Sequence, residues 1–398
     1  MELYADGEPI TKVEDHRSRG VRDGIYVPLY PIAEWFVTNW WFLWHEWRAG
    51  RPDSRHNLLA ARDGFALPDL SFLPTETRMQ LVWRSKPASE FDRVSFLFEG
   101  TRVVSKDTVR EEICSFIDAV TQRLNDRNVA ETFLATEWEA ILAAEKDPEQ
   151  KRFCEQAARL GIDPFNPESS IASSLEELDS LLPKTVIDDF CDAVRLNEIP
   201  SGVRAIRDFL ASLGGGAVGN ADWQNLHERF GISNGHTPWQ YGYDQARRLR
   251  AHLGLKGPIQ EDLLSVLRQA LDPLDIYPFE APIGIEAITA PSPDEVASFG
   301  ITNRVEREES RRFLLCRALS DLLVLHKPSL VTNAQTEHQQ RNRAFAAEFL
   351  APAEAIRERL PASHLSEEDV EDLAQEFRVS GFVVRHQIEN HKLAVITT

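Results

Sequence analysis

The chain has 398 residues, of which 42% are hydrophobic and 27% are charged, and its formal net charge at pH 7 is −19. This composition excludes a largely disordered chain, and the length predicts two or three domains because a single core rarely serves so many residues. The longest apolar stretch could span only about half a membrane, and the first residues lack the apolar core of a secretion signal. We therefore expect a cytoplasmic protein with no membrane partner.

The negative charge is concentrated in the middle of the chain. Residues 131–200 contain 16 acidic and 6 basic side chains, a net of −10, whereas residues 301–398 contain 15 and 13, a net of −2. Long-range electrostatics should therefore repel nucleic acid from the molecule as a whole, although not from its last quarter. The four cysteines are far apart and form no C-x-x-C pair, which favours reduced thiols and argues against a cysteine-based zinc site.

Residues 1–130 predict an N-terminal domain that combines helices and strands. Strand-like segments occur at 24–30, 79–84 and 93–104. Thr108 is then expected to cap a helix, because apolar residues recur at helical spacing after it.

A tryptophan-rich segment is the most unusual part of this domain, because five of the nine tryptophans lie between residues 35 and 47. Packing of one face of an aromatic helix into the core is one explanation. The alternative is a pocket for a peptide, a base or a nucleotide, formed by tryptophan and the polar residues that follow it. The candidates for such a pocket are Trp44, His56, Asn57 and Asp63.

The rest of the chain predicts a helical middle region at 131–213, a glycine-rich linker at 214–235 and a second domain at 236–398. In the second domain Thr237, followed by proline, should begin a helix that ends at Gly254. The elements expected after it are a helix at 260–271, strands at 274–281, 283–290 and 297–303, and a helix at 311–324. The fold class expected for the whole chain is α+β and predominantly helical.

The helix at 311–324, RRFLLCRALSDLLV, reads like the zinc-binding helix of a metallopeptidase without its ligands. In such a helix, His-Glu-x-x-His places two histidines on one face, and the glutamate acts as general base on the metal-bound water. Here the corresponding residues are Arg317, Ala318 and Asp321. A guanidinium cannot bind zinc and an alanine cannot move a proton, whereas Arg317 and Asp321 should form an ion pair across one helix turn.

A second motif, QQRNRAFAAEFLAPAEAI at 339–356, follows this helix. Together the two segments resemble the ImmA/IrrE family of bacterial and phage metallopeptidases, whose members look like RRFTLAHELGH followed by an FAA-containing helix. The resemblance covers about 236–398 and implies a zincin-like metallopeptidase-type domain, with an edge strand, here 299–303, before the metal helix. The matching residues are Arg311, Arg312, Phe313, Leu315, Leu319, Phe345, Ala346, Ala347, Leu350 and Pro352.

The resemblance places the family's functional positions on residues that depart from its pattern. The two zinc histidines fall on Arg317 and Asp321. The catalytic glutamate falls on Ala318, and the third ligand, also a glutamate, falls on Gln339. Because one carboxylate does not hold zinc, we expect a pseudopeptidase with no catalytic residue, no metal and no other cofactor.

The leading functional hypothesis is a protein-binding regulatory or scaffold module. Active family members cleave DNA-binding repressors, so the resemblance implies a protein partner: a regulator, a repressor or a component of a defence system. The implied setting is bacterial or phage stress response, toxin–antitoxin pairs or anti-phage defence. An alternative from the class of enzymes is a zinc endopeptidase with a rearranged metal site, for which His326, His338 and His364 are the available ligands.

The last helix pair, at 366–391, suggests a third hypothesis. Ser366 and Asp369 predict a capping box, and the apolar pattern after them is that of a helix-turn-helix. A DNA-binding transcription regulator would present the second helix to the major groove, and the DNA or partner contacts would be Arg385, His386, Gln387 and Asn390. Against this, the segment is rich in glutamate and poor in lysine, and ImmA/IrrE proteins often end in a similar helix pair that closes the domain.

Overall fold

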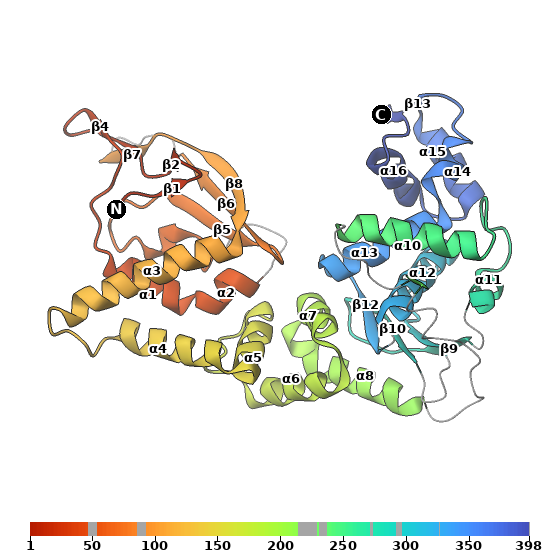
Figure 1. Cartoon of the computed structure of the whole chain (residues 1–398), viewed down its shortest axis with the longest axis horizontal. Helices are drawn as coiled ribbons and strands as arrows, with labels where there is room; N and C mark the ends of the chain where they lie inside the picture. Colours follow the sequence, from red (N-terminus) through yellow and green to blue (C-terminus); the bar gives the residue numbers. More distant parts are fainter. Residues whose placement is uncertain are drawn as a thin grey trace. The chain divides into compact units, whose positions relative to one another are not determined.

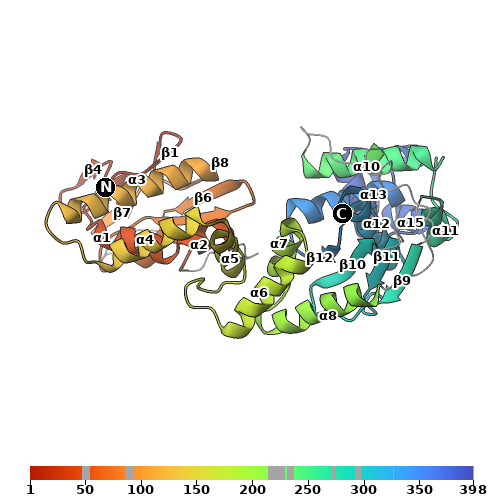
Figure 2. The ribbon, with the colours of Figure 1, turned by 60° about the horizontal axis from the view of Figure 1, so that its bottom comes forward.

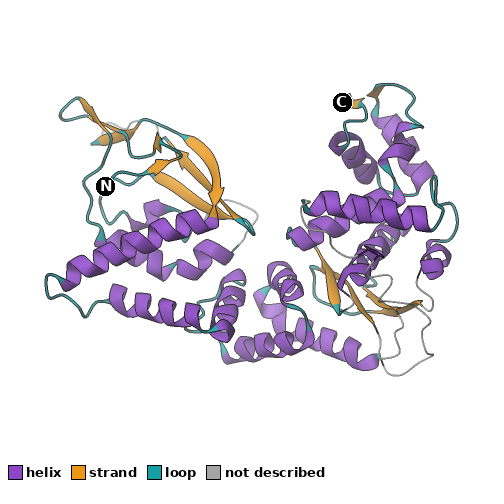
Figure 3. Cartoon of the chain, in the orientation of Figure 1, coloured by secondary structure: helices purple, strands orange, loops and turns teal. Residues whose placement is uncertain are grey.

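The computed structural model consists of two compact units, Met1–Pro167 and Glu168–Thr398. The residues that it describes are 1–46, 54–85, 93–213, 229–230, 237–270, 274–291, 297–325 and 327–397. Helices predominate, and the strands form small sheets in both units (Figures 1 and 3). Within these residues, every helix is too short or too polar to span a bilayer.

The boundary between the units divides the helical region that the sequence predicts at 131–213. Residues up to 167 belong to the N-terminal unit, and residues from 168 onward belong to the C-terminal unit. The predicted linker at 214–235 lies outside the described residues, apart from residues 229 and 230.

The N-terminal unit packs helices against small antiparallel sheets. Its elements are β1 (Tyr4–Ala5), β2 (Glu8–Pro9), β3 (Val13–Asp15), β4 (Gly20–Arg22), α1 (Tyr30–Thr38), α2 (Trp40–His45), the 3-10 helix η1 (Leu58–Ala61), β5 (Asp69–Pro74), β6 (Arg78–Arg84), β7 (Val94–Phe96), β8 (Gly100–Ser105), α3 (Lys106–Asn125), α4 (Phe133–Lys146) and α5 (Pro148–Arg159). The strands pair in the orders β5-β6-β8, β4-β3-β7 and β1-β2. Helix α3 packs against β6 and β8, and α2 packs against β5 (Figure 1).

Two local predictions for this unit are wrong. Residues 24–30 are not a strand, because Pro28 has no amide to donate to a ladder, and α1 begins at Tyr30. The helix α3 is capped by Ser105 rather than Thr108: the Ser105 hydroxyl accepts a hydrogen bond from the amide of Asp107 at 3.2 Å. Strand β8 ends at Ser105, so the chain turns directly from strand to helix.

The C-terminal unit is built around one four-stranded sheet. Its elements are α6 (Ser169–Leu181), α7 (Lys184–Ala193), the 3-10 helix η2 (Leu196–Glu198), α8 (Ile199–Ser212), α10 (Pro238–His252), α11 (Leu263–Ala270), β9 (Leu274–Pro278), β10 (Ile285–Pro291), β11 (Ala297–Ile301), α12 (Glu308–Leu325), β12 (Ser329–Thr332), α13 (Glu337–Leu350), α14 (Ala353–Arg357), β13 (His364–Leu365), α15 (Glu367–Phe377), α16 (Gly381–Asn390) and β14 (Val395–Ile396). The strand order is β12-β10-β11-β9, in which only β11 and β9 are parallel.

The sheet places the strand before α12 in its interior. Strand β11 pairs with β10 on one side and with β9 on the other, so the expectation of an edge strand at 299–303 is wrong. Helix α12 packs against β10 and β12, and α10 lies along α13 (Figure 2). A β-carbon at Gly242 of α10 would lie 2.3 Å from the carbonyl oxygen of Arg341, so this crossing requires glycine.

Helices α7 and α8 belong to the same unit as the sheet. The ring of Phe209 in α8 lies 5.6 Å from Phe279 and 6.3 Å from Tyr277, both next to β9 or in it. The end of α7 meets the start of β10, where Gly284 has a φ of +105° and a β-carbon would lie 2.2 Å from the carbonyl oxygen of Ala193. These helices therefore cover the sheet and do not form a separate region.

The helix starts predicted at Thr237 and Ser366 are confirmed, whereas α11 begins later than predicted, at Leu263, and α12 begins earlier, at Glu308. Thr237 and Gln240 form a capping box at the start of α10, and Gly254 adopts a φ of +68° after its end. Ser366 and Asp369 form the predicted capping box of α15.

Candidate functional site

The positions that the sequence singles out converge where α12 and α13 pack together. Helix α12 carries Arg317, Ala318 and Asp321, and α13 carries Gln339. Arg317 is only 5% exposed, and the other three are fully buried. The site is therefore part of the interior of the C-terminal unit.

Arg317 is held by three acceptors. Its Nη1 donates to Oε2 of Glu286 on β10 at 2.6 Å. Its Nη2 donates to the carbonyl oxygen of Thr332 at 2.5 Å and to Oε1 of Gln339 at 2.7 Å. The last bond joins two positions that the resemblance assigns to a zinc histidine and to the glutamate ligand.

The expected ion pair between Arg317 and Asp321 is not formed. Oδ1 of Asp321 pairs instead with Nη2 of Arg341 on α13, at 2.7 Å. The other hydrogen-bond partners of Asp321 are Asn342 at 2.7 Å, Ser329 at 2.8 Å and His338 at 2.6 Å. Helix geometry places residues 317 and 321 on one face, but neighbouring elements supply a closer partner of opposite charge to each.

His338 lies between two buried carboxylates. Its Nε2 is 2.6 Å from Oδ1 of Asp321, and its Nδ1 hydrogen-bonds to Oδ2 of Asp189 on α7. Asp189 also accepts from Nε2 of Gln339 at 2.7 Å and from the hydroxyl of Thr336. A continuous chain of hydrogen bonds therefore joins α7, α12 and α13. We call the buried side chains of Asp189, Arg317, Asp321, His338, Gln339 and Arg341, together with the half-exposed Glu286 at their edge, the buried network.

Charge and burial shift the pKa values of this network in opposite directions. Burial alone would lower the pKa of His338, but the charges of Asp321 and Asp189 outweigh it and raise the pKa to about 9. Burial alone would raise the pKa of Asp321, but the positive charge of His338 and its hydrogen bond hold it below the usual range. At neutral pH, His338 is therefore a cation between two anions, with both ring nitrogens donating.

The residues of the buried network do not fit a zinc ion. Arg317 offers no lone pair, and His338 uses both nitrogens on carboxylates, so Asp189 and Asp321 face the ring from two sides and not a common point. Among the described residues, no group of three or more His, Cys, Asp or Glu is arranged to hold a metal. Three cations (two arginines and His338) balance three carboxylates, so the network is neutral without an ion.

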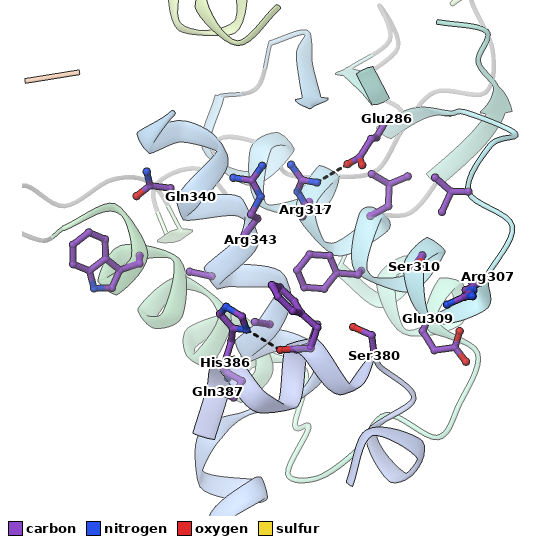
Figure 4. Close-up of a pocket in the computed structure, with 18 of the residues that line it drawn as sticks. Glu286, Arg307, Glu309, Ser310, Arg317, Gln340, Arg343, Ser380, His386 and Gln387 are labelled. Carbon is purple, nitrogen blue, oxygen red and sulfur yellow. Dashed lines mark hydrogen bonds and ion pairs between the residues drawn. The ribbon is translucent and has the colours of Figure 1, made fainter. Parts of the chain in front are cut away.

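An open groove lies beside the buried network, with a volume of about 890 Å³ (Figure 4). Helices α10, α12, α13 and α16 contribute to its walls. In Figure 4, Arg317 and Arg343 lie next to one another, while His386 and Ser380 line the wall formed by α16. The lining of the groove includes aromatic and cationic side chains, among them Trp239, Phe313, Arg317, Arg343, Phe382 and His386. Arg317 is thus shared between the groove and the network.

The site lies in a part of the chain that matches a known protein family. Residues 301–389 match the family model described as the IrrE N-terminal-like domain. This part of the chain is an ImmA/IrrE-like domain. The match spans α12 and α13, which confirms the resemblance seen in the sequence. A search of curated proteins gave no match to the chain.

The four residues proposed as DNA or partner contacts have different surroundings in the ImmA/IrrE-like domain. His386 and Asn390 line the groove. Arg385 forms an ion pair with Glu367 of α15. Gln387 lies behind the groove wall, where its side chain is fully buried and donates to Glu348 and to the carbonyl oxygen of Ala351, so it is not exposed for contact with DNA as the prediction requires.

The two histidines of the proposed rearranged metal site that the structure describes, His338 and His364, have different surroundings. His338 is committed to the buried network, and His364 is exposed on β13. His326 lies outside the described residues.

The pocket considered around Trp44, His56, Asn57 and Asp63 is not one open site. Trp44 and His56 are buried, and Nε2 of His56 lies 3.2 Å from the carbonyl oxygen of Phe42. The side chain of Asn57 caps η1. Asp63 is exposed in a left-handed turn with a φ of +36°.

The sequence analysis did not single out Asp189, which lies within the acidic stretch at 131–200. One signal was present: Asp189 follows Val186 by three residues, which places it on the apolar face of α7 with Phe190 beside it. All three are fully buried. A carboxylate on such a face predicts a buried partner.

Proposed function

We propose that the ImmA/IrrE-like domain is a pseudopeptidase that binds a polypeptide without cleaving it. The observation that carries this proposal is the 2.7 Å hydrogen bond between Arg317 and Gln339, which joins two expected ligand positions. Zinc-dependent hydrolysis needs a metal-bound water and a general base. Arg317 cannot bind the metal ion, and Ala318 cannot act as the general base.

The buried network contributes rigidity in place of chemistry. Asp189 of α7 bonds to α13, Asp321 of α12 bonds to α13 and β12, and Gln339 of α13 bonds to α7, α12 and β12. These bonds tie α7, α12 and α13 together. A buried network of hydrogen bonds and ion pairs holds its surroundings in one geometry while its partners are present. Nε of Arg317 is buried without a hydrogen-bond partner among the described residues, and the other two nitrogens of its guanidinium make the bonds given above. The floor of the groove next to Arg317 is therefore fixed before a partner arrives.

The groove retains the features of a polypeptide-binding surface. Trp239 is 47% exposed and Phe382 is 69% exposed, and both line it. Large exposed aromatic side chains beside a concave surface are typical of binding sites. The resemblance to proteases of DNA-binding repressors favours a regulator, a repressor or a defence-system component as the partner, in stress response, toxin–antitoxin pairs or anti-phage defence.

Site-specific crosslinking in the native host tests this proposal. A photoreactive phenylalanine analogue replaces Phe382 in the groove, and a matched control replaces Phe133, which is 50% exposed in the N-terminal unit. We expect a discrete protein of full length to be crosslinked from position 382 and not from position 133. Equal labelling from both positions would argue against binding in the groove, and recovery of a partner cut beside the crosslink would indicate a working peptidase.

A further inference from the structure

The groove carries a local excess of positive charge. Four arginines and three glutamates line it, which gives a net charge of +1. Arg317 bonds to Glu286 and Arg304 bonds to the backbone next to it, and together with Arg343 these residues carry +2. In Figure 4, Arg343 lies beside Arg317, whose guanidinium points to Glu286. We call Glu286, Arg304, Arg317 and Arg343 the basic patch.

Two guanidiniums of the basic patch have no carboxylate within ion-pair distance in the described part of the chain. Arg343 donates to the carbonyl oxygen of Ala334 at 2.7 Å, and Arg304 donates to that of Ile285 at 2.8 Å. Burial and the neighbouring Arg317 lower the pKa of Arg343 to about 10, so it stays charged at neutral pH. Arg304 is exposed and Arg343 is half-buried, and both donate to neutral acceptors. An anionic ligand would supply either guanidinium with a charge-assisted hydrogen bond.

The remaining charged residues of the groove do not extend the basic patch. They lie at the start of α12 and just before it, and sum to −1: Glu306, Arg307 and Glu309. Arg307 and Glu309 stand apart from Arg343 in Figure 4. The groove is therefore polarised along its length.

Apolar surface accompanies the basic patch. Trp239, Phe313 and Phe382 line the same groove, and the ring of Phe382 lies 4.0 Å from that of His386. The site thus offers guanidiniums and aromatic rings to one ligand. Such a pairing suits an acidic side chain next to a bulky apolar one.

We propose that the groove recognises a polypeptide segment through an acidic side chain held at the basic patch and a bulky apolar side chain held at Trp239 and Phe382. The inference deepens the proposed function and rests on it. The chain as a whole carries −19, so a patch of +2 is a local exception that would draw an acidic segment to this place.

Two smaller pockets adjoin the groove. One of about 580 Å³ shares Trp239, Tyr243 and Asn390 with it, and another of about 480 Å³ shares Arg304. A bound chain therefore has room to extend beyond the groove, which favours a carboxylate within the segment over a free C-terminus.

Selection from a display library of short random peptides, flanked by fixed glycine–serine linkers, tests the inference on the full chain. The variants are Arg343→Glu, Arg343→Lys and the control Arg357→Glu, an exposed position on α14 outside the groove. We expect peptides selected on the native chain to combine Asp or Glu with Phe, Leu or Trp. Arg343→Glu should remove the acidic preference, while Arg343→Lys and Arg357→Glu should keep it.

Binding of synthetic variants of the tightest-binding peptide to the native chain does not depend on whether the Arg343 variants fold. With an amidated C-terminus, replacing its acidic residue by the amide should weaken binding about ten-fold, the loss expected for one charge-assisted hydrogen bond. Selected peptides that bind without acidic preference, or only with a free C-terminus, would overturn this inference and leave the proposed function standing. Failure to select any peptide would overturn both.

Discussion

The two units bury their largest side chains and their charges in different ways. The N-terminal unit packs Trp40 against Trp44 and Trp138, with ring centroids 5.4 Å and 5.0 Å apart. The C-terminal unit instead buries Asp189 and Asp321 completely, on either side of His338. Aromatic packing stabilises a fold through apolar burial alone, whereas buried charges are stable only while every partner is present.

This difference is informative because of where the buried charges lie. They occupy the junction of α12 and α13, the place that the ImmA/IrrE resemblance assigns to zinc and its ligands. A metal ion would link these helices by coordination, and here ion pairs and hydrogen bonds link them. We interpret the buried network as a replacement that conserves shape without hydrolysis.

The largest expected effect follows from breaking the network at Asp321. Asp321→Ala leaves Arg341 and His338 without their shared carboxylate, and removing one partner of a buried ion pair costs about 3–5 kcal/mol. Urea unfolding followed by circular dichroism measures this loss. Asp372→Ala, at an exposed position on α15, is the matched control and should leave stability unchanged. A loss below about 1 kcal/mol at Asp321 would contradict the network's role.

The next effect is a dependence of stability on pH that belongs to the C-terminal unit. The pKa of His338 is about 9 in the folded chain and about 6.5 when unfolded, because Asp189 on α7 and Asp321 on α12 face it, with Arg341 of α13 also bonded to Asp321. The stabilisation is therefore complete below about pH 6.5 and is lost as the pH rises through about 9, by about 3 kcal/mol in total.

Unfolding free energies measured between pH 6 and pH 10 check this, with His338→Gln as the comparison. The native chain should lose stability across this range more steeply than the variant. Equal slopes for both proteins would show that His338 does not carry the charge assigned to it.

A smaller effect is expected in the aromatic core. Trp40→Phe keeps an apolar ring but leaves a small cavity beside Trp44 and Trp138, so we expect a loss of about 1–2 kcal/mol. The comparison variant in the C-terminal unit, Asp321→Asn, keeps the shape of the side chain but removes its charge. It should lower the free energy of unfolding by more than Trp40→Phe does. Thermal unfolding of the two variants compares them directly, and a larger loss for Trp40→Phe would reverse the distinction drawn between the units.

The smallest expected effect concerns helix caps, which both units contain. Thr132 caps α4 in the N-terminal unit, and Ser366 caps α15 in the C-terminal unit, each accepting a hydrogen bond from a backbone amide at 3.2 Å. Either residue replaced by alanine should cost about 1 kcal/mol. Thermal melts of the two variants should agree, and a much larger loss for Ser366→Ala would mean that the C-terminal unit is sensitive to any change.

The local structure of the C-terminal unit could be predicted well where the signal is short-range. The capping boxes at Thr237 and Ser366 depend on residues three apart, and both are present. The strand order could not be obtained in this way, because pairing of β11 with both β10 and β9 joins distant segments.

The sequence could predict where the site lies, but it could not predict which residues form hydrogen bonds and ion pairs there. Arg317 and Gln339 are hydrogen-bonded to one another, and Asp321 bonds to residues of the same helix α13. The partners that decide their chemistry, Asp189 and Glu286, come from parts of the chain that carry no motif. Contacts between residues so far apart in the sequence depend on how α7 and β10 pack, and the spacing of residues gives little information about them.

Metal analysis of the full chain, purified without chelators and dialysed against zinc, tests the central claim most directly. The account predicts no stoichiometric zinc, and no change in metal content on Asp321→Asn or His338→Gln. One zinc per chain, lost in either variant, would contradict it, because those side chains would then be ligands and not partners in an ion pair.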